Sequence, residues 1–478
     1  MHKRFAAVVT VLMAMGLSAC INLAPRRPQP ALELPTAWGA VATEATAIET
    51  GATWWHHFED ATLNRLIDEA LAHNAELAIA VARIDEARAE LGFARATQGP
   101  TLDATFGGAR THSSIATTYA FPPGAREYDT FRGGLNVAYE LDFWQRLRNT
   151  RRAARADLLA TQAAAATVRM SLSVLVAQTY FAIGALEAQL ADARRSVATR
   201  EAGLKLQALR FEVGAISEFE YRQLEGDVLS AKAQLPALER ERERQLTALA
   251  VLLGRSAREI FAAAPLFEAP PAIDAEATEA PAAPGLAVPS GLPSALLLRR
   301  PDLVAAEQRM LAANARIGAA RAAYFPSLAL TGIYGSESAV LRDLFSGPAL
   351  MWNVAANLTQ PIWGGGRAGA RVDTMRARER QALLQYEQAI RNAFADVRNA
   401  LVAQARAREQ LLIETERSAA LRKALKLAKL RYENGIASQL DVLDTERALL
   451  AAELSRHEAV RAQRAAVADL FKALGGGW

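Results

Sequence analysis

The sequence predicts a mixed α/β membrane protein, in which one chain supplies four β-strands and two very long helical hairpins that form an internal two-fold repeat. Similar segments recur at an offset of about 220 residues. Such an internal repeat indicates that the two halves of the chain have the same order of elements. Residues 370–434 contain neither Gly nor Pro, so they could form a helix of ~98 Å at 1.5 Å per residue. Between these helical stretches, short segments alternate apolar and polar residues, which is the period of a strand.

The repeat rests on pairs of similar segments. The matching pairs are 91–96 with 317–322, 143–144 with 362–363, and 210–212 with 431–433. The offset falls from 226 to 219 between the first two pairs because the loop between the second pair of predicted strands is shorter. Each half is therefore expected to contain two strands followed by one helical hairpin.

The predicted strands carry their apolar residues on one face. In the longest of them, Phe131, Leu135 and Tyr139 lie on one face, and Arg132 and Asn136 lie on the other. Strands of this kind suit a membrane barrel with a wet interior. Four strands are too few for a barrel, which needs about eight, and an open sheet edge in lipid leaves backbone groups unpaired. Several chains are therefore expected to share one barrel.

The chain divides into five predicted parts. These are a lipoprotein signal peptide (1–19), a lipidated extended segment (20–59), the first repeat (60–254), a Pro-rich linker (255–293) and the second repeat (294–475). The strands are expected at about 101–110, 131–143, 327–336 and 350–361, and the hairpin tips near 214–217 and 435–438. In the return helix of the first hairpin, Pro236 predicts a bend or a brief break.

The amino terminus is typical of an export signal. Two basic residues precede an apolar stretch from Phe5 to Leu17, which is shorter than the ~20 residues of a membrane-spanning helix. The only cysteine, Cys20, follows Leu17-Ser18-Ala19, and this ending resembles a bacterial lipobox. It predicts cleavage before Cys20 and attachment of lipid to the thiol and the new amino terminus. Ile21 favours the outer membrane, by resemblance to known sorting behaviour.

Composition and charge argue against several other classes of protein. The net charge of +4 falls to +2 once Lys3 and Arg4 leave with the signal peptide, and Arg alternates with Glu and Asp along the helical stretches. This pattern is typical of a solvated helix face, so no nucleic-acid partner is expected. The sequence has no phosphate loop, nucleophile elbow or metal-ligand cluster. We therefore expect no enzyme activity, no metal, and no cofactor beyond the covalent lipid on Cys20.

The two hairpin tips share one pattern of capping residues. A glycine can end the ascending helix in a left-handed conformation, and a serine followed three residues later by a carboxylate can form a capping box on the descending helix. These residues are Gly214, Ser217 and Glu220 in the first hairpin, and Gly435, Ser438 and Asp441 in the second. Asp444 lies one turn beyond Asp441 on the same face and has no capping role.

Several motifs together point to one family. They are Leu292-Pro293-Ser294, Arg299-Arg300-Pro301-Asp302, Ala312 to Gly318, Phe325-Pro326-Ser327-Leu328 and Tyr139 to Trp144. They resemble the signature of the NodT/OprM-type efflux lipoproteins of the TolC-like outer-membrane factor family. The match covers essentially the whole mature chain. It implies a homotrimer, in which each chain gives four strands to a twelve-stranded barrel above a helical tunnel that crosses much of the periplasm.

The resemblance also implies a function. Such a protein is the passive channel of a tripartite efflux system in the Gram-negative outer membrane. It would receive drugs or other toxic small molecules from an inner-membrane pump, usually proton-driven, through a periplasmic adaptor. The resemblance further implies that Asp441 and Asp444 point inward where the periplasmic mouth narrows. In a trimer, six carboxylates would then repel anions and attract cations.

Two alternatives remain open at the level of sequence. The first is a channel for protein secretion, because the same tube serves both purposes in this family. The second is a lipid-anchored coiled-coil stalk that never forms a pore. Seven unclustered methionines give no support to copper or silver export.

Overall fold

The computed structural model describes residues 22–30, 53–114, 116, 126–261 and 299–476. The signal peptide, Cys20 and most of the linker 255–293 lie outside this part of the chain, so the expectations for them remain predictions. The chain forms two compact units. Unit 1 comprises Met1–Ala31, Arg83–Thr161 and Ala305–Glu387, and unit 2 comprises Leu32–Ala82, Gln162–Val304 and Gln388–Trp478.

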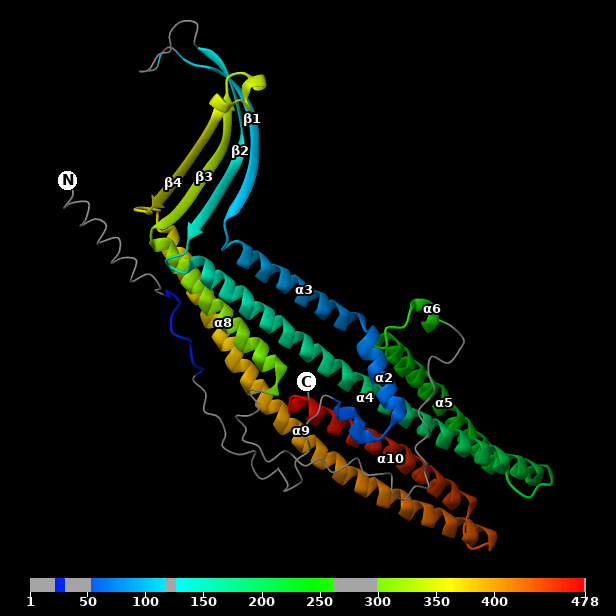
Figure 1. Cartoon of the computed structure of the whole chain (residues 1–478). Coiled ribbons are helices and arrows are strands. Elements are labelled where there is room, and N and C mark those ends of the chain that lie inside the picture. The colour runs from blue at the N-terminus through cyan, green and yellow to red at the C-terminus, as the bar shows by residue number, and fades with distance from the viewer. Residues whose placement is uncertain (1–21, 31–52, 115, 117–125, 262–298, 477–478) are drawn as a thin grey trace. The chain divides into compact units, whose positions relative to one another are not determined.

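The order of elements repeats once along the described chain (Figure 1). The first half contains η1 (Trp54–Phe58), α2 (Ala61–His73), α3 (Ala75–Ala96), β1 (Thr101–His112), β2 (Glu127–Leu141), α4 (Arg146–Glu212), α5 (Glu218–Leu252) and α6 (Ala257–Ile260). The second contains α8 (Pro301–Arg321), η3 (Ala322–Tyr324), β3 (Ser327–Ser338), η4 (Leu341–Asp343), η5 (Gly347–Ala349), β4 (Leu350–Thr359), α9 (Arg367–Glu433) and α10 (Gln439–Ala473). The helices α4 and α9 each have 67 residues, and α5 and α10 each have 35, which confirms the internal repeat.

Unit 1 contains the sheet, whose four antiparallel strands follow the chain order β1-β2-β3-β4 (Figure 1). The register aligns the apolar faces across all four strands. Leu102 lies opposite Val137 and Leu328 opposite Leu358, while Leu135 is opposite Tyr334, which in turn faces Trp352. Several of these side chains are well exposed, including Leu102, Trp352 and Leu358 at 65%, 71% and 68%. The sheet thus presents a continuous apolar face that the described residues leave uncovered.

The opposite face of the sheet is polar. Asn136 donates a hydrogen bond to Thr105 across β1 and β2 at 2.7 Å, and Asn357 donates to Thr331 across β3 and β4 at 3.3 Å. Arg132 of β2 pairs with Glu337 of β3 on the same face. Within the described part of the chain, β1 and β4 each have only one neighbouring strand, so the sheet has two edges without a partner.

The second strand differs from its predicted bounds of 131–143 at both ends. It starts at Glu127, because Glu127 to Thr130 continue the ladder with β1, and it ends at Leu141. The early end follows from Asp142, whose carboxylate accepts hydrogen bonds from the backbone nitrogens of Leu147 and Arg148 and so caps α4. Phe143 therefore lies in the turn before α4 and not on the apolar face of the sheet.

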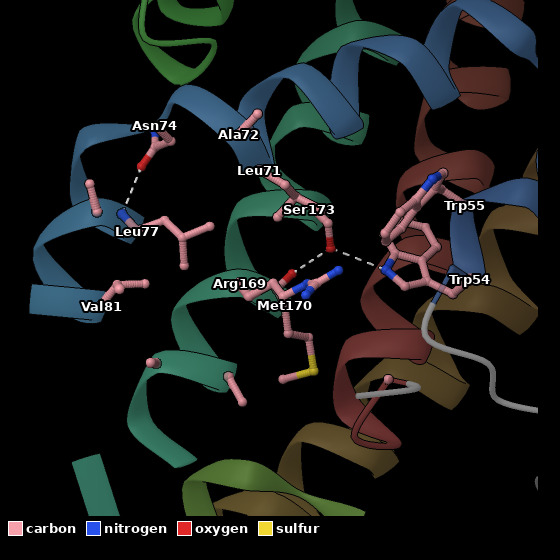
Figure 2. A pocket seen from close by; sticks show the side chains of 14 residues that line it. Trp54, Trp55, Leu71, Ala72, Asn74, Leu77, Val81, Arg169, Met170 and Ser173 are labelled. Carbon is pink, nitrogen blue, oxygen red and sulfur yellow. Dashed lines mark hydrogen bonds between the residues drawn. The ribbon is translucent and has the colours of Figure 1, made fainter. Parts of the chain in front are cut away.

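Unit 2 is organised by a cluster of aromatic side chains. Trp54 and Trp55 of η1 are each 2% exposed. The Trp54 ring lies 5.4 Å from that of Phe471 in α10, and its Nε1 donates to Ser173 Oγ in α4 at 3.1 Å (Figure 2). Both tryptophans line a cavity of about 700 Å³, whose other walls come from α4 and from the α2–α3 junction, where Asn74 caps α3 (Figure 2).

The long helices of the first hairpin are continuous. α5 runs through Pro236 without interruption, so the predicted break is absent. By length and composition alone, α4 could cross a membrane. Its apolar residues Val176, Ile183 and Leu190 are buried against neighbouring helices, whereas Leu175 is 48% exposed.

The Arg-Arg-Pro-Asp motif starts α8 and ties it to two other helices of unit 2. Pro301 is the first helical residue, as the sequence predicts. The buried Arg300 guanidinium donates to Asp302 at 2.8 and 3.0 Å, to Asp396 of α9 at 2.9 Å, and to the carbonyl of Ala473 in α10. The role of this motif is therefore structural.

Each hairpin also has an ion pair between its own two arms. In the first, Lys232 of α5 pairs with Glu201 of α4 at 2.6 Å. In the second, Arg422 of α9 pairs with Glu453 of α10 at 3.0 Å. The two pairs occupy equivalent positions at an offset of 221 residues, but their charges are reversed.

Candidate functional site at the hairpin tips

Both hairpins turn in the same way at their tips, which lie in unit 2. Gly214 has φ +70° and Gly435 has φ +73°, a left-handed conformation that favours glycine. The backbone nitrogen of Ala215 donates to Arg210 O at 2.8 Å, and that of Ile436 donates to Arg431 O at 2.9 Å. Together with the i to i−3 bonds of the two glycines, these contacts form a Schellman motif at the end of each ascending helix.

A capping box starts each descending helix. Ser438 Oγ accepts from the backbone nitrogen of Asp441 at 3.2 Å, while Asp441 Oδ2 accepts from both the backbone nitrogen and the hydroxyl of Ser438 at 2.9 Å. Ser217 and Glu220 make the same contacts in the first hairpin. The backbone N–H of Ser438, and then its hydroxyl, lower the pKa of Asp441 below its usual value. Asp441 is therefore exposed, ionised and held in one orientation.

The second acidic residue of the predicted aperture belongs to a chain of ion pairs. Asp444 is exposed and accepts from Arg447 at 3.2 Å. The Arg447 guanidinium also donates to Asp227 Oδ1 of α5 at 2.6 and 2.7 Å. Asp227 is 3% exposed, and its other oxygen accepts from the buried Arg200 of α4 at 2.8 Å. The chain of contacts runs from the second hairpin into the interior of the first.

A second contact links the hairpins closer to their tips. The hydroxyl of Tyr432 in α9 accepts from Arg210 Nη1 at 3.1 Å and from Gln207 Nε2 at 3.3 Å, both in α4. Tyr432 and Arg447 of the second hairpin thus both contact the first hairpin.

The two hairpins leave a cavity of about 580 Å³ between them, which both polar and apolar side chains line. Gly203 of α4 lines it, and a Cβ added there would meet no atom within 4 Å. Tyr432 and Asp227 line the same cavity. The contacts that join the hairpins therefore border a cavity, which the buried apolar residues Val228, Val442 and Leu443 also line.

Exposed apolar residues lie at and around both tips. Val213 and Phe219 flank the first turn at 78% and 76% exposure, and Ile436 and Leu440 flank the second at 68% and 45%. Large apolar side chains grouped in this way are typical of a surface that binds another protein.

The sequence indicated some of these residues and missed others. The seven tip residues Gly214, Ser217, Glu220, Gly435, Ser438, Asp441 and Asp444 were all selected from local spacing. The structure adds Arg447, Asp227 and Arg200. Only Arg447 had a local signal, because it follows Asp444 by one helical turn, whereas Asp227 lies about 220 residues away and has none. Within the described residues, no group of three potential metal ligands was found.

Comparison with known proteins gives one consistent family. The profile described as outer membrane efflux protein matches residues 66–255 and 292–476. The chain is 32% identical to the cation efflux system protein CusC of Escherichia coli, with 98% of this chain and 97% of CusC covered. It is 33% identical to the toluene efflux pump outer membrane protein TtgI of Pseudomonas putida, with 97% and 96% covered. The crystal structure of the CmeC outer membrane channel of Campylobacter jejuni superposes with a TM-score of 0.88 at 26% identity, with 96% of this chain and 95% of CmeC covered.

Proposed function

Because this chain belongs to the outer membrane efflux protein family and is an outer-membrane channel component of an efflux system, we propose that three copies assemble into the conducting unit. Each copy would give four strands to a twelve-stranded barrel. The observation that carries this proposal is the sheet, which has a continuous apolar face and two unpaired edges. An unpaired edge in lipid costs several kcal/mol per backbone group, so β1 of one copy must pair with β4 of the next. A non-conducting stalk would not need such a sheet.

We further propose that the hairpin tips form the gate of this channel. Asp441 and Asp444 of three copies would form two rings of carboxylates at the periplasmic mouth, where they attract cations and repel anions. The contacts of Tyr432 and Arg447 support a closed state, because both join the second hairpin to the first. Opening would break these contacts and separate the hairpins along the cavity between them.

The remaining components follow from the family and from the exposed tips. We propose that Val213, Phe219, Ile436 and Leu440 contact a periplasmic adaptor, which delivers cargo from a proton-driven inner-membrane pump. We propose small toxic molecules as cargo and passive conduction as the activity, with no chemical step in this chain. A lipid on Cys20 would anchor each copy.

Single-channel recording in planar bilayers tests the gate. We expect the double variant Asp441→Ser and Asp444→Ser to conduct at least about twofold better than the unaltered channel and to lose cation preference, because the rings lose their charge. Glu220→Ser is the matched control, since it removes the equivalent capping carboxylate from the first hairpin and should leave selectivity unchanged. Equal conductance and selectivity in all three proteins would remove both aspartates from the gate.

A further inference from the structure

The loop between β3 and β4, residues 339–349, folds back over the apolar face of the sheet in unit 1. Leu344 of this loop is fully buried. A Cβ added to Gly133 of β2 would lie 3.8 Å from Leu344 Cδ2 and 3.2 Å from Phe106 Cδ2 of β1. Gly133 is two residues from Leu135 on β2, so both point to the apolar face. Leu344 therefore lies on the apolar face of the sheet and not on the polar one.

The loop reaches the sheet where the apolar pattern of β3 ends. Ser336 and Ser338 occupy the last two positions of β3 on this face, and both are half-buried. The positions before them are occupied by Leu328, Leu330, Gly332 and Tyr334. Ser336 lies opposite Gly133, so Leu344 contacts the sheet at the level of the serines. Ser338 Oγ also accepts from the backbone nitrogen of Val340 at 3.2 Å. The loop thus supplies apolar surface that the end of β3 lacks.

The exposed side of the loop is apolar as well. Phe345 is 85% exposed, and Val340 and Leu341 are also exposed. Much of the loop backbone is satisfied internally, which irregular chain needs where water is scarce. At 3.1 to 3.2 Å, the nitrogens of Asp343, Leu344, Ser346 and Ala349 donate to the carbonyls of Val340, Leu341, Asp343 and Ser346. The loop is therefore an ordered surface that keeps apolar side chains on its outside.

We propose that this loop anchors the channel in the outer leaflet, where Leu341 and Phe345 enter the boundary between acyl chains and headgroups. The inference rests on the proposed barrel, whose apolar face is the side that contacts lipid. The loop continues that face at the end of the sheet remote from α8 and α9 (Figure 1). Aromatic residues favour this depth in a membrane. A loop that narrowed the pore would lie on the polar face instead.

A basic side chain of the loop is suited to the headgroups. The Arg342 side chain is 85% exposed, and its contact with Asp343 at 3.5 Å is of the exposed kind that contributes little to stability. A long basic side chain can keep its charge in the polar layer while neighbouring apolar residues enter the acyl chains. Arg342 would thus bind lipid phosphate groups while Leu341 and Phe345 lie deeper.

Fluorescence quenching in reconstituted vesicles tests the position of the loop. Phe345→Cys is labelled with a fluorophore, and quenching by nitroxide-bearing lipids is compared with quenching by iodide in water. Trp352→Cys on the apolar face and Glu337→Cys on the polar face of the sheet are the matched controls. The only native cysteine is Cys20, so the unaltered chain labelled in parallel gives the background.

The expected results differ clearly between the two faces. Nitroxide lipids should quench the label at position 345 at least about twofold more than the label at position 337, as they should at position 352. Quenching at position 345 that matches position 337 would overturn the proposal. Conductance of the same vesicles and lipid quenching at position 352 report the barrel independently. A failure of the loop is therefore distinguishable from a failure of the barrel.

The buried leucine provides a second test in the Phe345→Cys protein. Leu344→Ser should lift the loop from the sheet and lower lipid quenching of the label about twofold, because it places a hydroxyl in an apolar contact. Leu358→Ser is the matched control, since it removes an exposed leucine from the far end of the same face and should leave quenching unchanged. Equal quenching in both variants would overturn the role of Leu344 in holding the loop.

Discussion

At the scale of single residues, one serine at the second tip positions a carboxylate that the gate would use. Ser438 binds Asp441 through its backbone N–H and its hydroxyl, and this binding lowers the pKa of Asp441. The spacing of serine and carboxylate predicts this contact from sequence because the partners are three residues apart. The ion pair of Asp444 and Arg447 is also local. The contact of Arg447 with Asp227 could not be predicted, because these two residues meet only after both hairpins have folded.

The pH dependence of the Asp441 charge follows from this contact. A depressed pKa means that the charged cap is fully formed above the ordinary carboxyl pKa and is lost as the pH falls through the lower folded value. Ser438→Ala removes the hydroxyl contact and keeps the backbone one. We expect the pH at which cation preference disappears to rise, as measured from reversal potentials. Ser217→Ala is the control, and a midpoint unchanged by Ser438→Ala would contradict the assignment.

At the scale of elements, the sequence predicted all four described strands and both hairpins, and the differences in detail have local causes. Most of α9 follows from a stretch without Gly or Pro, the helices of the first hairpin follow from the internal repeat although they contain Gly203 and Pro236, and the strands follow from alternation. The strand expected at 131–143 ends at Leu141 because Asp142 caps the next helix. The break expected at Pro236 is absent, since a single proline removes one hydrogen bond from a helix of 35 residues that tertiary contacts stabilise.

The link between the hairpins can be tested through Asp227, which is buried between two arginines. Asp227→Asn would leave Arg200 buried beside a neutral acceptor, and we expect it to lower the free energy of unfolding by about 3 kcal/mol. Asp444→Asn removes the exposed partner of the same Arg447 and should cost less than about 1 kcal/mol. Denaturant titration followed by circular dichroism measures both. Equal losses in the two variants would show that Asp227 does not join the hairpins.

At the scale of the whole molecule, one chain leaves strand edges and apolar side chains without partners among the described residues. Its sheet has two unpaired edges, and Phe93 on α3 is 76% exposed. The sequence predicted that copies must share a barrel from strand number alone. The sequence could not identify the contacting surfaces, because it does not show which apolar side chains the folded chain leaves exposed.

Phe93 and Phe219 provide a matched pair for testing assembly, because each is 76% exposed. If α3 packs against a second copy, Phe93→Glu will bury a charge in that interface, and the trimer is expected to dissociate. Phe219→Glu lies at a hairpin tip and should leave the trimer intact. Light scattering in detergent distinguishes the two results. A trimeric Phe93→Glu protein would exclude this part of α3 from the interface.

The reversed ion pairs of the two hairpins have a consequence for folding. If the arms exchanged partners, Glu201 would meet Glu453, and Lys232 would meet Arg422. Each correct pair stabilises its hairpin only weakly, as exposed pairs do. Repulsion between like charges nevertheless disfavours this exchange between the two similar hairpins. The charges thus favour pairing of α4 with α5 and of α9 with α10 over the exchanged pairing.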